Sequence, residues 1–190
     1  MSGIIFLVVL VVVALWVVGA YNRLIGLKNQ VVNGWKQIDV QLKRRHDLIP
    51  NLVNTVKGAM DFEKSTLEAV IAARNKAVSA TGVKATAQAE GELTQALGRF
   101  FALTEAYPQL KATGNVAQLQ EELTSTENKI GFARQFYNDV ATEYNTKQAQ
   151  FPTNLLAGLA KASPAELWEI EDAGERAVPQ VDLSMNKPPA

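Results

Sequence analysis

The sequence predicts an all-α protein, with an N-terminal transmembrane helix followed by an elongated antiparallel bundle of three to four long helices. Three observations predict this fold. The first twenty residues carry no charge, and every residue from Ile4 to Val18 is apolar. Apolar residues then recur at steps of three and four, which is typical of amphipathic helices, and no segment shows the alternation of a β-strand. The 190-residue length suits one anchor and one domain of ordinary size.

The run from Ile4 to Ala20 is predicted to be a single membrane-spanning helix. Such a helix is roughly 25 Å long, a little shorter than the roughly 30 Å hydrocarbon core of a bilayer. Tyr21 follows it and suits the membrane interface. One alternative is a cleaved signal peptide, because Val18-Gly19-Ala20 is a passable cleavage site, but residues 1–3 lack the basic charge of such a peptide. Another is a buried helix of a soluble fold, which would need the polar face that this run lacks.

Charge is balanced over the whole chain and uneven along it. There are 19 basic and 19 acidic residues and no cysteine, so net charge does not predict nucleic-acid binding, and disulfides and thiolate metal sites are excluded. Basic residues cluster after the span and none precedes it. The positive-inside rule therefore predicts residues 1–3 outside, 4–20 in the membrane and 21–160 as a cytoplasmic bundle. Residues 161–190 are acidic and contain proline, and we expect them to be loosely ordered.

The helix after the span carries a seam like that of a coiled coil. Twelve positions from Tyr21 to Ala59 step by alternating three and four, and ten of them are apolar. The pattern keeps its phase across Pro50. Pro50 either kinks one long helix or begins a second helix with Asp47 as its N-cap. Unbroken phase favours the kink, whereas matching the lengths of the other helices favours the break.

The later helices follow from apolar spacing and from turn signals. The first pattern fades before Gly82, a residue type that commonly stops helices. Pro108 ends the next pattern, because the residue before a proline avoids the helical region. The expected helices are about Val83 to Tyr107, Val116 to near Pro152, and a short amphipathic piece from Leu155 to Ala160.

Several strings of this sequence resemble the LemA family of bacterial membrane proteins. Residues 21–58 read YNRLIGLKNQVVNGWKQIDVQLKRRHDLIPNLVNTVKG, residues 126–145 read TENKIGFARQFYNDVATEYN, and residues 105–111 read EAYPQLK. The resemblance reaches from the anchor to about Ala160, and RRHDLIPNLV is a specific string within it. It implies a single-pass protein of the bacterial inner membrane with a cytoplasmic helical bundle and no established enzymatic activity. A member from magnetosome-forming bacteria implies a part in membrane shaping or assembly.

No motif for catalysis or cofactor binding is found, so we predict a protein that is not an enzyme and needs no cofactor. His46 is the single histidine of the chain, whereas transition-metal sites usually need several His or Cys ligands. HExxH, CxxC and Gly-rich phosphate loops are absent. Polar residues at bundle positions instead predict a buried polar layer, because buried charges persist when paired and can fix register. Its members would be Arg44, Arg45, His46, Asp47, Glu127 and Asn138, with Asp139 and Glu143 as further candidate partners.

Contact with lipid head groups is predicted for Arg23 and Lys28, the basic residues nearest the span. Arg44 and Arg45 lie about 36 Å past the end of the span along a straight helix, which is several Debye lengths from the bilayer charge.

Two functions remain open. One is a self-assembling scaffold that organises or shapes the bacterial membrane. The other is a membrane-tethered adaptor or regulator of a membrane protein such as a protease or sensor. If the first helix continues to Ser79, a second helix that ends near Tyr107 returns only to about the level of Pro50. The apolar residues closer to the span are then uncovered and predict the seam of a homo-oligomer, formed by Leu24, Val31, Trp35, Ile38 and Leu42.

Overall fold

The fold is all-α, as predicted, with one long apolar N-terminal helix packed against further long helices. The computed structural model describes residues 1–57, 64–107 and 114–169. The elements are α1 (Ser2–Lys57), α2 (Lys64–Ser79), α3 (Val83–Glu105), α5 (Gly114–Ala149) and the short α6 (Asn154–Ala157). Within these residues there is no strand.

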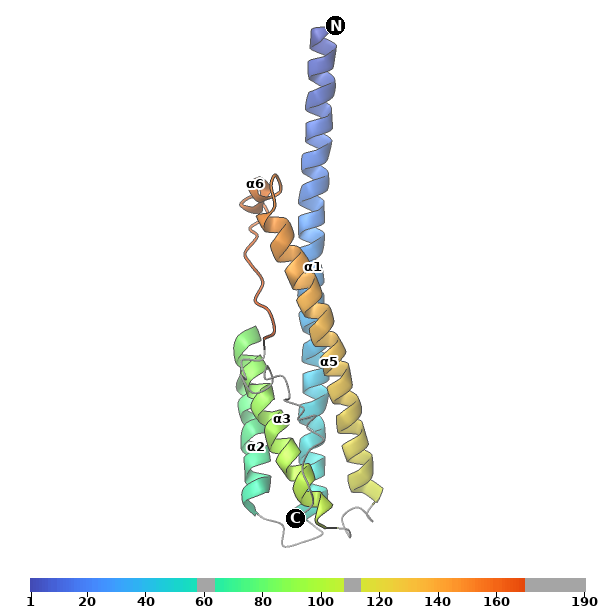
Figure 1. Cartoon of the computed structure of the whole chain (residues 1–190), viewed down its shortest axis with the longest axis vertical. Coiled ribbons are helices and arrows are strands. Elements are labelled where there is room, and N and C mark those ends of the chain that lie inside the picture. The colour runs from blue at the N-terminus through green and yellow to red at the C-terminus, as the bar shows by residue number, and fades with distance from the viewer. Residues whose placement is uncertain (58–63, 108–113, 170–190) are drawn as a thin grey trace, which may run out of the picture.

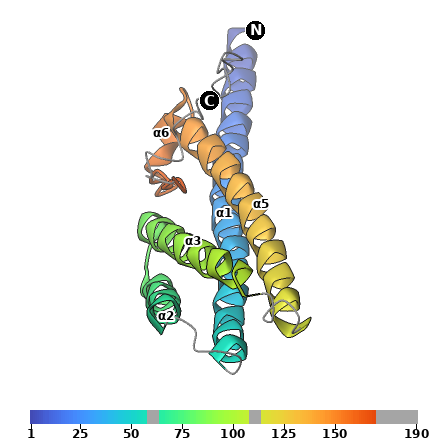
Figure 2. The ribbon, with the colours of Figure 1, turned by 60° about the horizontal axis from the view of Figure 1, so that its bottom comes forward.

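The bundle is built on the C-terminal half of α1, and the N-terminal half stands beyond it (Figure 1). α2 and α3 form a pair on one side of α1, and α5 packs along α1 on another side (Figures 1 and 2). The chain runs away from the free half of α1, returns in α2, runs out again in α3 and returns in α5 (Figure 1). This is the antiparallel arrangement expected of helices joined by short connections.

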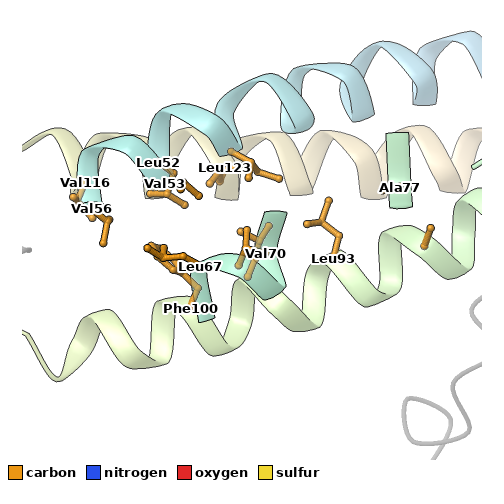
Figure 3. Packing of buried hydrophobic residues seen from close by; sticks show 13 residues of the cluster. Leu52, Val53, Val56, Leu67, Val70, Ala77, Leu93, Phe100, Val116 and Leu123 are labelled. Carbon is orange, nitrogen blue, oxygen red and sulfur yellow. The ribbon is translucent and has the colours of Figure 1, made fainter. Parts of the chain in front are cut away.

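The expectation that the first helix continues to Ser79 is wrong. α1 ends at Lys57, and α2 begins at Lys64 and runs in the opposite direction. The reversal brings Leu67 and Val70 of α2 into one hydrophobic cluster with the end of α1, as Figure 3 shows. A straight helix would leave these side chains far from that cluster, so burial of their apolar surface favours the turn.

Pro50 lies inside α1, so the alternative in which it begins a second helix is also wrong. A proline has no N–H, and the carbonyl of the residue four positions earlier therefore loses its helical donor. That carbonyl belongs to His46, and Nε of Arg74 on α2 donates a hydrogen bond to it at 3.3 Å. Arg74 thus satisfies the acceptor that Pro50 leaves open.

Three apolar clusters follow one another along α1. The farthest from the free half of α1 joins all four long helices, and Figure 3 shows Val53 and Val56 of α1 close to Phe100 of α3. The middle cluster contains Ile38 and Leu42 and is formed chiefly with α5. The third lies nearest the free half and contains Leu24, Leu27, Tyr144 and Ala160.

Residues 162–169, the C-terminal strap, form an extended segment that packs on α5. The side-chain amide of Asn138 bonds both backbone groups of Trp168 at 2.8 and 2.9 Å. Asn145, two helical turns away, bonds both backbone groups of Ala165 at the same distances. Loose order from residue 161 was expected from the acidic composition. That expectation is wrong for the strap, because these two asparagines hold its backbone at Ala165 and Trp168 and the Tyr137 hydroxyl donates to the carbonyl of Glu166 between them. Residues 170–190 lie outside the described residues.

Candidate functional site

The charge cluster joins α1, α3 and α5 in the middle of the bundle. It consists of Arg45 and His46, Glu90 and Thr94, and Glu127. The guanidinium of Arg45 lies 3.1 Å from Glu90 and 3.0 Å from Glu127, and it donates to the Thr94 hydroxyl at 2.8 Å. Nε2 of His46 lies 2.5 Å from the other carboxylate oxygen of Glu90. The side chains of Arg45 and Glu90 are only 4% and 5% exposed.

This geometry suits a structural role better than chemistry on a substrate. A buried charge is costly unless it is paired, and here each charge is held by a group on another helix. The cavity beside the cluster measures about 110 Å³ and is lined in part by Arg45, Glu90 and Trp168. Among the described residues, no group of three or more His, Cys, Asp or Glu side chains is placed to hold a metal ion.

The structure brings three members of the predicted polar layer together, of which Arg45 and His46 are buried and Glu127 is partly exposed. Arg45, His46 and Glu127 come together, but Arg44 and Asp47 are exposed. Neighbouring residues on a helix point in different directions, so four consecutive polar residues cannot share one face. Asp47 instead accepts a hydrogen bond from Lys43 at 2.7 Å, and this bond holds the pKa of its carboxyl below the ordinary 3.8.

Two further polar residues of the prediction lie elsewhere. Asn138 holds the C-terminal strap, and Glu143 pairs with Arg23 at 3.3 Å. The principal acidic partner, Glu90, was missed. A signal existed, because Glu90 lies in phase with the buried Thr86, Leu93, Leu97 and Phe100 of α3, where an apolar residue would be expected.

The predicted oligomer seam belongs to the chain's own core. Leu24, Ile38 and Leu42 are buried, and Val31 and Trp35 are partly buried against the same clusters. The ring of Trp35 packs 5.7 Å from Tyr137 and 6.0 Å from Trp168.

The reason is the path of α5, which returns along α1 as far as Leu24, where Tyr144 joins the same cluster. The expectation that these five residues are uncovered is therefore wrong, and no seam is left there for a second copy.

A different apolar surface is open, between the outer faces of α1 and α5. This aromatic groove has a volume of about 560 Å³ and is lined by Lys36, Gln37, Val40, Gln41, Lys129, Phe132, Ala133 and Phe136. Phe132 is 74% exposed and Val40 is 63% exposed. The sequence shows two phenylalanines one turn apart on α5, but it does not show that this face points away from the core.

Gly34 brings the two walls of the groove together. A Cβ at this position would lie 3.3 Å from Cα of Tyr137 and 3.5 Å from the ring of Phe136. A side chain on α1 would therefore push α5 away.

The residues predicted to meet head groups lie where α1 leaves the apolar run. Arg23 is exposed beside Glu143, and Nζ of Lys28 donates to the carbonyl of Lys161 at 3.1 Å. Within the part of the chain that the structure describes, α1 holds the one stretch long and apolar enough to cross a membrane, and none of that stretch is buried. Head-group contact by these two residues stays a prediction.

The family model and the similar proteins point to the same family. The family model of the LemA family matches residues 34–183. The chain is 30% identical to Protein LemA of Metamycoplasma hominis over 142 residues, which cover 74% of this chain and 64% of that protein. It is 24% identical over 181 residues to Magnetosome proteins MamQ 1 and MamQ 2 of Paramagnetospirillum magneticum, with 82% of this chain and 66% of each relative covered. The chain thus spans about two thirds of the length of these relatives.

Proposed function

Since the chain belongs to the LemA family, we propose that it is a non-enzymatic, membrane-anchored scaffold that assembles with copies of itself and organises or shapes the bacterial membrane. The apolar part of α1 is the anchor in this proposal. Similarity to two magnetosome proteins supports a role at membranes. The observation that carries the proposal is the aromatic groove, an apolar surface left open between α1 and α5.

The groove has the character of an interaction surface. Most of the large apolar side chains of the bundle are buried in the three clusters, whereas Val40, Phe132 and Phe136 remain exposed together. Contiguous apolar surface rimmed by polar residues marks association sites on soluble domains. Full burial of one such side chain is worth about 1.5–3 kcal/mol.

A shared membrane places the grooves of two copies at the same height. α1 is continuous from the anchor to Val40, so the groove is held at a set distance, roughly 30 Å, beyond Ala20. Copies that are anchored in parallel in one bilayer therefore present the same surface at the same level. This arrangement suits a two-fold pair in which each copy contributes the same patch.

The charged residues that line the groove are both lysines, Lys36 of α1 and Lys129 of α5. The exposed carboxylates of Asp39 and Asp139 belong to the same two helices but do not line the groove. The apolar side chains, rather than charge pairs, therefore carry the proposed contact.

Self-association of the full chain tests this proposal. We expect wild-type protein in mild detergent to form dimers or larger assemblies by light scattering. Val40→Asp with Phe132→Asp should yield monomers with unchanged helix content by circular dichroism, since both side chains are exposed. Val78→Asp is the matched control, because Val78 is an exposed apolar residue of α2, outside the groove. It should assemble like the wild type.

A wild type that stays monomeric at high concentration, or a double variant that assembles normally, would contradict the scaffold proposal. The membrane-tethered adaptor of a membrane protein would then be the better function.

The bundle is proposed to face the cytoplasm, because basic residues such as Arg23 and Lys28 directly follow the apolar run. A reporter that is active only in the periplasm, fused after Ala190, should stay silent, and activity of this reporter would reverse the orientation.

A further inference from the structure

The turn after α5 lies beside the apolar run of α1. This membrane-proximal turn, residues 150–161, contains α6 (Asn154–Ala157) and lies at the end of the bundle that faces the free half of α1 (Figure 1). A cavity of about 320 Å³ between the two is lined by Trp16, Gly19 and Ala20 of α1, by Lys147 of α5 and by Thr153 of the turn. The turn therefore reaches the level of the last residues of the apolar run, which ends at Ala20.

The turn has one apolar side that packs and another that does not. Leu156 and Ala160 are buried, and Ala160 belongs to the cluster with Leu24 and Tyr144. Three larger side chains point away from this cluster into open space: Phe151 is 80% exposed, Leu155 69% and Leu159 74%. Their exposure is unfavourable in water, since burial of each is worth about 1.5–3 kcal/mol.

We propose that Phe151, Leu155 and Leu159 insert into the same bilayer that α1 spans, and that the turn is a second, interfacial membrane contact of this protein. Two independent observations meet here: the turn is level with the end of the apolar run, and its free side is apolar. An amphipathic segment at this depth buries its apolar side at the boundary between head groups and acyl chains. The bilayer is thus the surface that covers these side chains.

Basic residues flank the turn at the height of the head groups. Lys147 precedes it, Lys161 ends it, and Arg23 of α1 lines the same cavity as Lys147. Lysine and arginine at such positions favour anionic lipids. Arg23 also forms an exposed ion pair with Glu143 of α5 at 3.3 Å.

A second contact restricts the bundle in a way that one anchor cannot. A bundle held by α1 alone is free to rotate about the axis of that helix. Insertion of the turn on one side of α1 fixes this rotation and sets which face of the bundle lies over the membrane.

The test measures the depth of the turn in the full chain. The sequence contains no cysteine, so Leu155→Cys and Leu159→Cys each give one site for an environment-sensitive fluorophore. Each variant is reconstituted into bilayers of phosphatidylglycerol and phosphatidylcholine that carry a lipid-attached quencher. Val78→Cys, exposed on α2, is the control site.

We expect the probes at 155 and 159 to emit at shorter wavelength and to lose intensity to the lipid-attached quencher, while the probe at 78 responds to aqueous iodide instead. Adding Leu155→Asp to the Leu159→Cys variant should return that probe to the aqueous behaviour without loss of helix content. Probes at 155 and 159 that are quenched by iodide as strongly as the probe at 78 would overturn the proposal.

Discussion

Replacing Arg45 with methionine measures how much the charge cluster contributes to the stability of the bundle. Methionine keeps most of the aliphatic volume and removes the guanidinium, which lies 3.1 Å from Glu90 and 3.0 Å from Glu127. Glu127 is partly exposed and can be solvated, but the Glu90 carboxylate is only 5% exposed. Removing one partner of a buried ion pair costs about 3–5 kcal/mol, and we expect the lower end of this range because His46 keeps its bond to Glu90.

That cost corresponds to a large shift in thermal unfolding. For a chain of this size 1 kcal/mol moves Tm by roughly 2–4 °C, so a cost of about 3 kcal/mol corresponds to a fall of roughly 6–12 °C. The assay is thermal unfolding of the full chain in detergent, followed by circular dichroism. Lys43→Met is the matched control on the same helix, because it breaks the exposed 2.7 Å pair with Asp47 and should change Tm little. Equal Tm values for the two variants would refute the argument that the cluster is buried and cooperative.

Two further predictions follow from close packing and from burial. Gly34→Leu should lower the free energy of unfolding by about 1–3 kcal/mol, because α5 must move away. Gly131→Ala, whose added Cβ meets nothing within 4 Å, should raise it by up to about 1 kcal/mol. Denaturant titration measures both, and a change of the same sign in the two variants would contradict the close approach at Gly34. Burial, with the nearby Glu166 carboxylate, raises the pKa of Tyr137 above the ordinary 10.0. The neutral phenol of Tyr137 therefore stabilises the folded chain fully below pH 10.0, and this contribution is lost as the pH rises through the folded-state pKa. Alkaline titration followed by tryptophan fluorescence should show a step as Trp168 of the strap is released, and Tyr137→Phe should lack this step. The same fluorescence profile in the wild type and in Tyr137→Phe would argue against assigning the step to Tyr137.

The sequence predicted the elements of the fold well and their packing less well. Apolar periodicity located α3 and α5 and the apolar run of α1, because it reports which face of a helix is buried. It could not locate the break after Lys57, since the apolar pattern of α1 continues into α2. Nor does periodicity say which helix covers a given face. The seam from Leu24 to Leu42 was therefore assigned to a second copy, when α5 of the same chain covers it.

Site residues were predicted correctly where burial follows from the pattern of their own helix, and they were missed where burial depends on another segment. Arg45 lies in phase with an apolar seam, so its burial could be inferred from α1 alone. The role of Asn138 could not, because its amide acts on the backbone of Trp168, in a segment whose acidic composition suggested disorder. The groove around Phe132 was missed for a related reason: an apolar residue on a helix is assumed to face the core until the packing is known.

The packing of α1 against α5 also sets an order of events during synthesis. The apolar face between Leu24 and Leu42 is made about 100 residues before Tyr144, at the end of α5 that covers it, and at roughly 5–20 residues per second this takes roughly 5–20 s. The C-terminal end of α1 is covered sooner, because α2 and α3, which pack on it, are synthesised before α5. The part of α1 nearest the apolar run is therefore the last to be enclosed, and the bundle closes toward that run once α5 has been made.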